Sequence, residues 1–525
     1  MKALQKLFTN HIFLLIVIGI FLFIIGNNNF TLFDNSETNY SAVAQEIIQT
    51  GDYLTMHFNN ENWYIHPPLY FWISSTLCQT FGWNEFNLRL PEAIFGILGL
   101  IMVYLIAKLY YSKKTSFYSA IILGTSLIYF VISRLAVFDT LLNTFILLAV
   151  YFFLKSYLEP TKKGKYFFFF AISCFLGVMT KGPIGLVHPC AVIVVFLLLK
   201  RDIKFLLDRK VILNFLLFLL ITSPWYIHQL ITNGAPFFDK ALRDYTWYRF
   251  FGVVENQAGP WWYYFPMLLT FIPWIFYLPV IIKDTFIKNE TTKIKDIKLF
   301  SWIFIIFTFI FFSFAGTKLP SYIFGMFPFM SILIADQLES LKNKKTIIFS
   351  TILTLLFFIS LFIFSLQYKL PLPYTKEMPL FITFFFIPAL VVAIFSYFLI
   401  KEKVSKAMLV ITTGTIIFCL FLVFFFFPQL DNYKDSKHFV ETIKNQGISD
   451  YTVGVYGHYT PYLIYYLNQK IYTPNNLEEV NNLINVNKPL FIMARNTDKN
   501  KLLENYANSK ILDTYIEFSA LLITE

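Results

Sequence analysis

AMLVITTGTIIFCLFLVFFFFP, residues 407–428, is a run of apolar and small residues without a charged side chain. About 17 to 25 predominantly apolar residues suffice for a helix to cross the hydrocarbon core of a bilayer. Strands of a membrane barrel would alternate apolar and polar side chains, and this run does not. It therefore predicts a membrane-spanning helix, because a backbone in lipid must satisfy its hydrogen bonds internally.

Similar runs recur along the whole chain and predict its fold class. They lie at residues 9–26, 88–108, 115–133, 140–156, 166–180, 183–199, 211–228, 263–282, 298–314, 320–337, 346–367, 378–400 and 407–428. They predict an all-α polytopic membrane protein with about thirteen spanning helices, in which residues 166–199 could also form one broken unit. The first run leads into three asparagines without a small-residue cleavage site, which favours a retained helix over a signal peptide.

The composition also indicates lipid as the main solvent. Of the 525 residues, 57% are hydrophobic and only 14% are charged, a balance that no ordinary soluble domain shows. The net charge of +11 does not indicate a nucleic-acid partner, because Lys and Arg form short clusters between apolar runs. The cysteines are scattered and predict neither a disulfide framework nor a metal site: Cys78, Cys174, Cys190 and Cys419.

The basic clusters predict the orientation in the membrane. Short loops rich in Lys and Arg favour the cytoplasmic side. Alternate connections carry such clusters, for example Lys113-Lys114 and Lys162-Lys163-Lys165, so the N-terminus is expected in the cytoplasm. The opposite face then receives residues 27–87, 134–139 and 229–262, the turn at Lys318 and a tail from about residue 430.

The tail differs in composition from the rest of the chain. It is rich in Asn, Lys, Asp and Tyr, and its short apolar stretches at 452–456 and 490–493 are bounded by turn residues. It predicts a small soluble α/β domain at residues 430–525. The membrane domain would then comprise residues 1–429, including the first outer loop at 27–87.

Polar side chains at membrane depth are costly, so those of the outer loops are the best indicators of function. Asp34 and Glu37 begin a segment with apolar residues on one helical face: Tyr40, Val43, Ala44, Ile47 and Ile48. One interpretation makes Asp34 the N-cap and Glu37 the N3 residue of a capping box. A second, compatible with the first, makes one carboxylate a general base for a hydroxyl nucleophile.

Two lysines occupy tight turns on the expected outer side. Lys181 precedes Gly182-Pro183 and Lys318 precedes Leu319-Pro320, where the orientation rule disfavours positive charge. This placement suits an anion-binding site at the outer leaflet. Snorkelling anchors would give the same pattern.

Other ionisable residues of the outer loops have simple structural explanations as well. His66 lies among aromatic residues before two prolines, where a packed or solvated histidine is the plain alternative. Arg134 and Asp139 end adjacent predicted helices, where an interfacial salt bridge is the alternative. Arg249 precedes the aromatic cluster 259–264, interpreted as an interfacial belt.

Eight short motifs between residues 30 and 330 occur in a defined order. They are Ser36-Glu37-Thr38-Asn39-Tyr40 through Gly51-Asp52, His66-Pro67-Pro68, Asn84-Glu85-Phe86 with Arg89-Leu90-Pro91, Arg134-Leu135-Ala136-Val137-Phe138-Asp139, Thr180-Lys181-Gly182-Pro183, Pro224-Trp225-Tyr226, Gly259-Pro260-Trp261-Trp262-Tyr263-Tyr264 and Lys318-Leu319-Pro320-Ser321-Tyr322. In this order they resemble the GT-C superfamily of polyprenyl-phosphate-dependent glycosyltransferases. The resemblance is strongest to the branch that contains bacterial lipid A aminoarabinose transferase and relatives of protein O-mannosyltransferases.

The resemblance implies an inverting glycosyltransferase of the bacterial inner membrane, with a cytoplasmic N-terminus, interfacial helices in the first outer loop and a periplasmic C-terminal domain. The sugar would come from a polyprenyl phosphate, usually undecaprenyl phosphate. The expected acceptor is lipid A or a related cell-envelope glycolipid, and a protein or a polysaccharide is the alternative. A non-catalytic transporter or flippase is disfavoured, because the polar groups cluster on one face and no repeat is visible.

Residue types and resemblance together suggest roles. The donor phosphate would be bound by groups that offer positive charge or hydrogen bonds: Tyr40, His66, Lys181, Arg249, Lys318 and Tyr322. Asp139 would orient the site or help to hold a divalent metal ion, which carboxylates bind well although no pattern requires one. The family's aspartate base aligns with Ser36, so Asp34 or Glu37 would be the base here. Further departures at Asn39, Ile65-His66 and Tyr245-Thr246 leave the sugar and the acceptor open.

Overall fold

A computed structural model describes residues 10–33, 35–284, 290–341, 343–484, 488–506 and 508–523. Contacts between residues divide the chain into two compact units. The first comprises Met1–Asn27, Tyr64–Tyr70 and Arg89–Val423. The second comprises Asn28–Trp63, Phe71–Leu88 and Phe424–Glu525.

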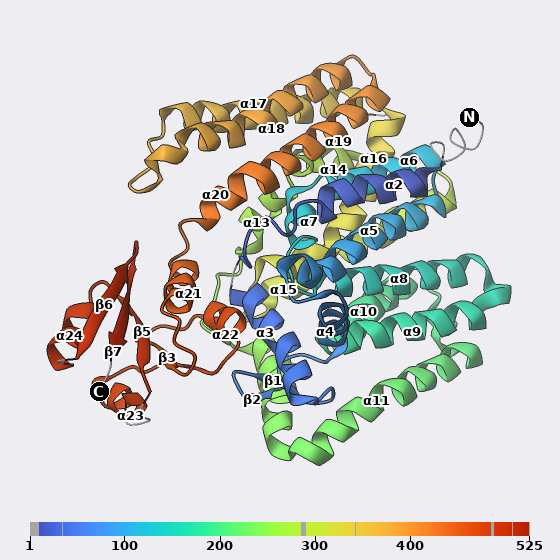
Figure 1. Ribbon diagram of the computed structural model, residues 1–525. Coiled ribbons are helices and arrows are strands. Elements are labelled where there is room, and N and C mark those ends of the chain that lie inside the picture. Colours follow the sequence, from blue (N-terminus) through green and yellow to red (C-terminus); the bar gives the residue numbers. More distant parts are fainter. Residues whose placement is uncertain are drawn as a thin grey trace. The chain divides into compact units, whose positions relative to one another are not determined.

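The first unit is built from helices that follow the predicted apolar runs (Figure 1). Its elements are α2 (His11–Gly19), η1 (Ile20–Ile24), α5 (Glu85–Lys108, from Arg89 on), α6 (Lys113–Gly124), α7 (Leu127–Ile132), α8 (Asp139–Leu158), η2 (Pro160–Lys162), α9 (Lys163–Lys181), α10 (Ile184–Leu199), η3 (Ile203–Leu207), α11 (Arg209–Phe237), η4 (Phe238–Tyr248), α12 (Arg249–Phe251), α13 (Tyr264–Met267), η5 (Leu268–Phe271), η6 (Trp274–Tyr277), α14 (Leu278–Asp284), α15 (Thr292–Phe314), η7 (Pro320–Met326), α16 (Phe327–Ser340), α17 (Lys344–Gln367), η8 (Tyr374–Glu377), α18 (Met378–Ile400) and α19 (Val404–Phe421).

Eight of the described helices are long and apolar enough to cross a membrane, or nine if one bent pair forms a span. This pair, Tyr264–Phe271 and Trp274–Asp284, is bent by 102° at a break that contains Pro273, which has no backbone N–H for a helical hydrogen bond. Each of the thirteen predicted segments contains helix, so the polytopic helical fold is confirmed. The count of thirteen spans stays a prediction, because segments such as His11–Ile24 are apolar but short.

Residues 166–199 form two helices joined by a tight turn. α9 ends at Lys181, α10 begins at Ile184, and Gly182 between them has a φ of 81°, in the left-handed region that favours glycine. The helices then pack backbone against backbone, because a Cβ on Gly185 would lie 2.2 Å from the carbonyl carbon of Gly177. Only small residues allow such close helix packing.

Two buried arginines donate hydrogen bonds to the carbonyl oxygens at the end of the first described helix. Arg134 donates hydrogen bonds of 2.7 Å from Nη1 to the carbonyl oxygen of Leu22 and from Nη2 to that of Ile25. Arg89 donates from Nη1 to the carbonyl oxygen of Asn27 at 2.8 Å. The last carbonyls of a helix have no partner within the helix, and the two guanidinium groups provide one here.

A five-stranded sheet forms the C-terminal part of the second unit (Figure 1). Its strands are β3 (Thr452–Val455), β4 (Ile471–Tyr472), β5 (Leu490–Arg495), β6 (Ser509–Thr514) and β7 (Phe518–Ile523), in the order β4-β3-β5-β7-β6. β3 is parallel to β4 and β5, and β7 is antiparallel to β5 and β6. Helices α23 (Leu477–Ile484) and α24 (Lys499–Asn505) add Val480 and Leu502 to the core formed with the strands. The predicted small C-terminal α/β domain is confirmed.

The first-loop segments pack with this C-terminal part. They are α3 (Asn35–Thr50), β1 (Met56–Phe58), β2 (Glu61–Trp63) and most of α4 (Leu69–Phe81), and the unit also contains α20 (Phe427–Asp431), α21 (Asp435–Asn445) and α22 (Pro461–Leu467). The side chain of Asn59 exchanges two hydrogen bonds of 2.9 Å with the backbone of Ile471 in β4. The predicted domain boundary near residue 430 rests on composition and stays a prediction.

The α9–α10 packing gives a first prediction. Gly185→Ala should lower the free energy of unfolding by about 1–3 kcal/mol, the usual cost of overpacking, because the new methyl group has no room against Gly177. The measurement is the thermal midpoint of the purified protein in detergent. Val187→Ala is the matched control, because Val187 lies on the same helix with 44% of its surface exposed. Equal midpoints for Gly185→Ala and the control would contradict the close contact.

Candidate functional site

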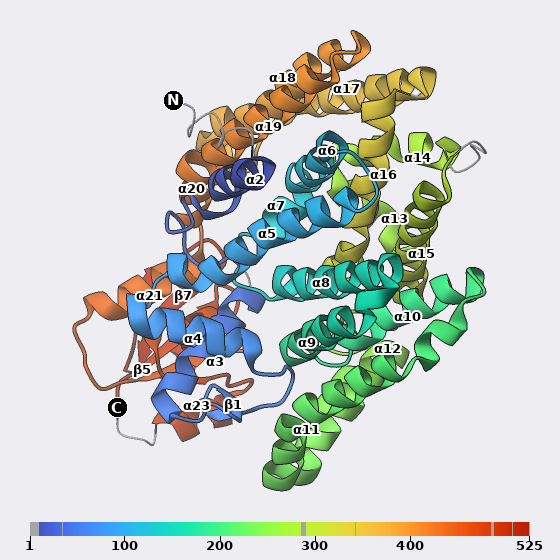
Figure 2. The ribbon, with the colours of Figure 1, turned by 90° about the vertical axis from the view of Figure 1, so that its right-hand side faces the viewer.

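An ion pair between α8 and α9 is the centre of the candidate site. Asp139 is the first residue of α8, Lys181 is the last of α9, and Nζ of Lys181 lies 2.5 Å from Oδ1 of Asp139. Figure 2 shows the two helices side by side. The helix dipole favours a carboxylate at an N-terminus and an ammonium at a C-terminus. The predicted alternative of an Arg134–Asp139 salt bridge is wrong, because Arg134 is bound to main-chain carbonyls instead.

Glu92 of α5 holds the start of α8 in place. Its Oε2 accepts the backbone N–H of Thr140 at 2.8 Å, and its Oε1 accepts that of Leu141 at 3.2 Å. The side chain is fully buried. It satisfies two of the N–H groups that every helix start leaves without a partner. The sequence analysis missed Glu92, although a lone carboxylate within the apolar run 88–108 was the available signal.

Lys181, Tyr322 and Arg249 lie close together although they come from three separate elements. The ammonium of Lys181 lies 5.8 Å from the centre of the Tyr322 ring. Nε of Arg249 donates to the Tyr322 hydroxyl at 2.6 Å, and Nη2 donates to Oε1 of Gln257 at 3.0 Å. The first unit therefore brings together two cations and a phenol that the sequence analysis had assigned to phosphate binding.

Lys318 is bound to the end of α15. Its Nζ donates to the carbonyl oxygens of Ser313 at 2.8 Å and Ala315 at 2.6 Å. The residue is 5% exposed, and burial lowers the pKa of its amine. Such a lysine caps the helix, so its part in phosphate binding stays a prediction.

His66 packs edge-on against Phe138, with the ring centres 4.5 Å apart. The ammonium of Lys181 lies 5.0 Å from the centre of the same Phe138 ring. Burial lowers the pKa of His66 well below its usual value, and the positive charges of Lys181 and Arg249 lower it further. The lowered pKa favours the neutral imidazole at pH 7, not the positive charge that was expected.

The first-loop candidates belong to the second unit. Glu37 is fully buried in the first turn of α3, and its Oε2 accepts the backbone N–H of Phe33 at 2.5 Å. This N–H belongs to the residue before the expected N-cap, so the capping box itself stays a prediction. The ring of Tyr40 lies edge-on to that of Phe71, with the centres 6.1 Å apart. Asp34 lies outside the described residues.

A carboxylate cluster with metal-ligand geometry occurs elsewhere in the first unit. Asp284, Glu290 and Asp336 have oxygen atoms within 4.8 Å of one another, and among the described residues this is the only such group of three. The ammonium of Lys298 is bound to all three, at 2.8 Å from Glu290 and 3.2 Å from Asp336. Lys298 therefore neutralises part of the negative charge of this cluster. A metal ion at Asp139 stays a prediction.

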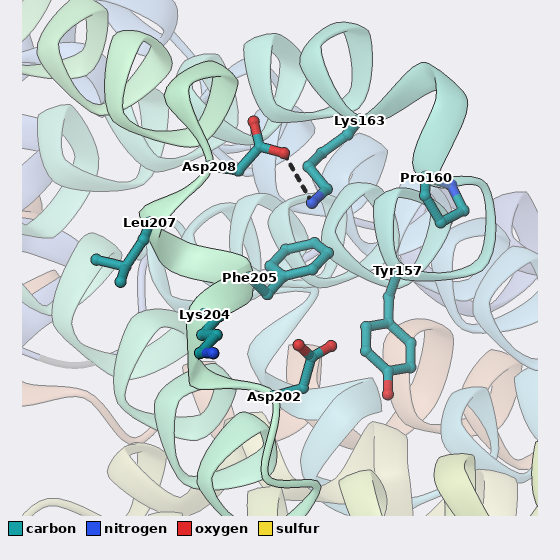
Figure 3. A pocket seen from close by; sticks show the side chains of 8 residues that line it. All are labelled: Tyr157, Pro160, Lys163, Asp202, Lys204, Phe205, Leu207 and Asp208. Carbon is teal, nitrogen blue, oxygen red and sulfur yellow. Dashed lines mark hydrogen bonds and ion pairs between the residues drawn. The ribbon is translucent and has the colours of Figure 1, made fainter.

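A pocket of about 670 Å³ lies at the far end of α8. Its lining residues are Tyr157, Pro160, Lys163, Asp202, Lys204, Phe205, Leu207 and Asp208, and Figure 3 shows Lys163 directed toward Asp208. Tyr157 follows Asp139 by 18 helical residues, or about 27 Å along the axis. This pocket is therefore distinct from the candidate site.

Comparisons with known proteins agree with this arrangement. Residues 65–228, which include His66, Asp139 and Lys181, match the family described as dolichyl-phosphate-mannose-protein mannosyltransferase. The chain is 27% identical to an undecaprenyl phosphate-alpha-4-amino-4-deoxy-L-arabinose arabinosyl transferase of Enterobacter sp. (strain 638), over 59% of this chain and 56% of that one. It is 28% identical to an uncharacterised protein of Aquifex aeolicus (strain VF5), over 63% of this chain and 65% of that one.

The fold can be compared along almost its whole length. The crystal structure of ArnT from Cupriavidus metallidurans bound to undecaprenyl phosphate superposes with a TM-score of 0.84 at 18% identity, covering 97% of both chains. The chain therefore has the fold of that structure along almost its whole length. The apolar helices and this similarity indicate a multi-pass membrane protein. The sequence matches cover less than two thirds of the length of the first two relatives, at 65% and 56%.

The neutral state of His66 gives a second prediction. A histidine with a lowered pKa binds fewer protons in the folded than in the unfolded state, so its contribution to stability is present above about pH 6.5 and decreases as the pH falls. Between pH 7.5 and 5.5, the thermal midpoint should therefore fall less in His66→Gln than in the parent protein. The contribution is at most about 1.4 kcal/mol per pH unit. His228→Gln is the matched control, and a fall in His66→Gln equal to that of the parent would contradict the neutral assignment.

Proposed function

We propose that the protein is an inverting glycosyltransferase that takes a sugar from a polyprenyl phosphate, with undecaprenyl phosphate as the expected carrier. The observation that carries the proposal is the proximity of Lys181, Arg249 and Tyr322 beside Asp139. A lipid phosphate gains negative charge as it leaves the sugar, and fixed cations with oriented donors stabilise that charge. The likeness of the fold to the structure with undecaprenyl phosphate and the names of the relatives support the same reaction.

The proposed site faces the outer side of a bacterial inner membrane. The basic clusters belong to the other ends of the helices, for example at the end of α8 opposite Asp139. The N-terminus is then cytoplasmic and the C-terminal sheet is periplasmic. Soluble nucleotide sugars do not occur on that side, which favours a lipid-linked donor.

The general base is proposed in the first loop. Glu37 already accepts the N–H of Phe33, and this contact restricts its side chain. We therefore favour Asp34 as the base that deprotonates the acceptor, with Glu37 as the alternative and Asp139 as the group that positions Lys181. His66 and Tyr40 would add hydrogen bonds to the donor phosphate, and Lys318 would add positive charge. A divalent ion at Asp139 is compatible with its carboxylate chemistry.

Lipid A or a related envelope glycolipid is the proposed acceptor. The description of the family matched by residues 65–228 names a protein as the acceptor of the sugar. A protein Ser or Thr is therefore the second candidate. Mass spectrometry of lipid A, glycoproteins and surface glycans, with and without the gene, distinguishes the two. The acceptor is the class of molecule, lipid A, glycoprotein or surface glycan, that carries a sugar in cells with the gene and lacks it in cells without the gene.

A third prediction tests the donor. Purified protein should release free polyprenyl phosphate from a polyprenyl-phosphate sugar when acceptor is present, and it should not consume nucleotide sugars. Lys181→Met should reduce turnover by about 10²–10³-fold, because it removes a charge that stabilises the leaving group. Lys165→Met, on the side of the basic clusters, is the matched control and should keep parental turnover. Consumption of a nucleotide sugar without any polyprenyl lipid would refute the proposal.

A fourth prediction concerns the base. Asp34→Asn should reduce turnover by about 10²–10⁴-fold while the protein stays folded, because Asn caps a helix about as well as Asp. Glu37→Gln keeps an oxygen that can accept the N–H of Phe33 and should affect turnover less. Normal turnover in Asp34→Asn with loss in Glu37→Gln would transfer the role to Glu37. Normal turnover in both would exclude a base in this loop.

A further inference from the structure

Two buried polar side chains in the first unit have atoms without a partner. Asn143 of α8 and His188 of α10 are each 3% exposed. Neither Oδ1 nor Nδ2 of Asn143, nor Nδ1 of His188, has a hydrogen-bond partner among the described residues. Buried polar groups without a partner are uncommon in folded proteins and require an explanation. An amide that is unpaired on both its atoms points to a ligand.

The hydrogen bonds around His188 define what its free nitrogen can do. The Thr308 hydroxyl donates to the carbonyl oxygen of Phe304 at 2.7 Å, so it has only lone pairs to offer His188. Nε2 of His188, 2.9 Å from that hydroxyl oxygen, must therefore carry the proton and donate it. In the neutral ring, Nδ1 is then an acceptor. Asn143 adds two N–H donors and one carbonyl acceptor.

Gly325 of η7 leaves space between these two side chains. A Cβ built on Gly325 would lie 3.6 Å from Cε1 of His188 and 3.7 Å from Oδ1 of Asn143. Both side chains therefore border the space that a side chain at this position would fill. Gly325 is itself partly exposed, although Asn143 and His188 are buried.

This space lies one turn below the proposed phosphate site. Asn143 follows Asp139 by four residues on α8, which places it on the same helix face about 6 Å deeper. Gly325 follows Tyr322 by three residues on the 3-10 helix η7, again about 6 Å along the axis and in line with it. Two elements that carry residues of the candidate site, Asp139 on α8 and Tyr322 on η7, thus continue into the same polar layer.

We propose that Asn143, His188 and Gly325 form a subsite that binds a hydroxyl group of the sugar on the donor lipid. A hydroxyl both donates and accepts, so it can donate to Nδ1 of His188 and accept from Nδ2 of Asn143. A phosphate group accepts only and suits the cations one turn above. The missing side chain of Gly325 leaves room for a group about the size of a methyl or hydroxyl, bordered also by Cε1 of Phe304 at 3.6 Å. This inference rests on the proposed transferase function and assigns the part of that site that recognises the sugar.

A bound water molecule has the same donor and acceptor pattern as a sugar hydroxyl. The two sources differ in their dependence on the donor, because a structural water stays whether or not a sugar is bound. Two substitutions test the subsite. Asn143→Leu removes the hydrogen bonds at similar volume, and Gly325→Ala fills the space at ordinary contact distances of 3.6–3.7 Å without a clash. The control is Ser396→Ala on α18. Like Asn143→Leu, it removes a buried polar group without a partner among the described residues.

The experiment measures dissociation constants of the full-length protein in detergent for three lipids. They are undecaprenyl phosphate alone, the same lipid carrying 4-amino-4-deoxy-L-arabinose and the same lipid carrying glucose. The parent protein should bind at least one sugar-bearing lipid more tightly than the bare phosphate. Asn143→Leu and Gly325→Ala should abolish this gain, weakening the sugar-bearing lipid at least about tenfold, and leave the bare phosphate within about twofold. The control should behave like the parent.

The outcomes separate this inference from the proposed function. A parent protein that binds none of the three lipids contradicts the transferase proposal itself. A parent that binds them with no gain from a sugar, or variants that keep the gain, overturns the subsite and identifies a structural water. Asn143→Leu should also keep or raise the thermal midpoint, because an unpaired buried amide is replaced by an apolar group. A clear fall in the midpoint would show that the amide serves the fold and would overturn the subsite as well.

Discussion

Lipid offers no hydrogen bonds to a peptide group, and this constraint determines how the charged residues of the first unit are used. Arg134 and Arg89 satisfy the carbonyls at the end of the first helix, and Lys318 satisfies those at the end of α15. Glu92 accepts hydrogen bonds from the N–H groups at the start of α8. Charged side chains that look functional in the sequence thus form hydrogen bonds with the main-chain groups that helix ends leave without a partner.

These helix ends in turn position the groups that remain for chemistry. Glu92 fixes the first turn of α8, which carries Asp139, and Asp139 holds the ammonium of Lys181. Arg249 is oriented independently through the Tyr322 hydroxyl and Gln257. Cations fixed in this way need little reorganisation when charge develops on a leaving group, which is the physical basis of electrostatic catalysis. The contacts that complete the start of α8 therefore also fix Lys181, while Arg249 is held by a separate set of hydrogen bonds.

The features that the sequence predicts well are those that depend on local composition. Apolar runs such as 407–428 predict helices, and the change of composition near residue 430 predicts the α/β domain. The ion-pair partner of a charged residue does not depend on the nearby sequence alone. Asp139 is close in sequence to Arg134 but pairs with Lys181, because the packing of α8 on α9 brings the lysine to the helix start. Glu37 likewise accepts the N–H of Phe33, one residue before the N-cap position that the spacing predicts.

Single polar residues inside apolar runs were the least predictable. Glu92, Asn143 and His188 each interrupt a run that otherwise specifies a spanning helix, so they were counted as helix and given no role. Their significance depends on which atoms of neighbouring helices are already bonded. That information exists only in three dimensions, as the Thr308 hydroxyl shows for the tautomer of His188.

The edges of the five-stranded sheet bear on how an acceptor could be recruited. β4, at one edge, has only two residues, and β6, at the other, carries a bulge between Ile511 and Asp513. Lys510 and Asp513 on β6 are exposed, and charges and bulges are devices that discourage the addition of another strand. Among the described strands, the sheet thus presents no long regular edge to an extended peptide. The sheet edges therefore disfavour an acceptor recruited as an added strand, and they place no such restriction on a glycolipid headgroup, which has no strand to add.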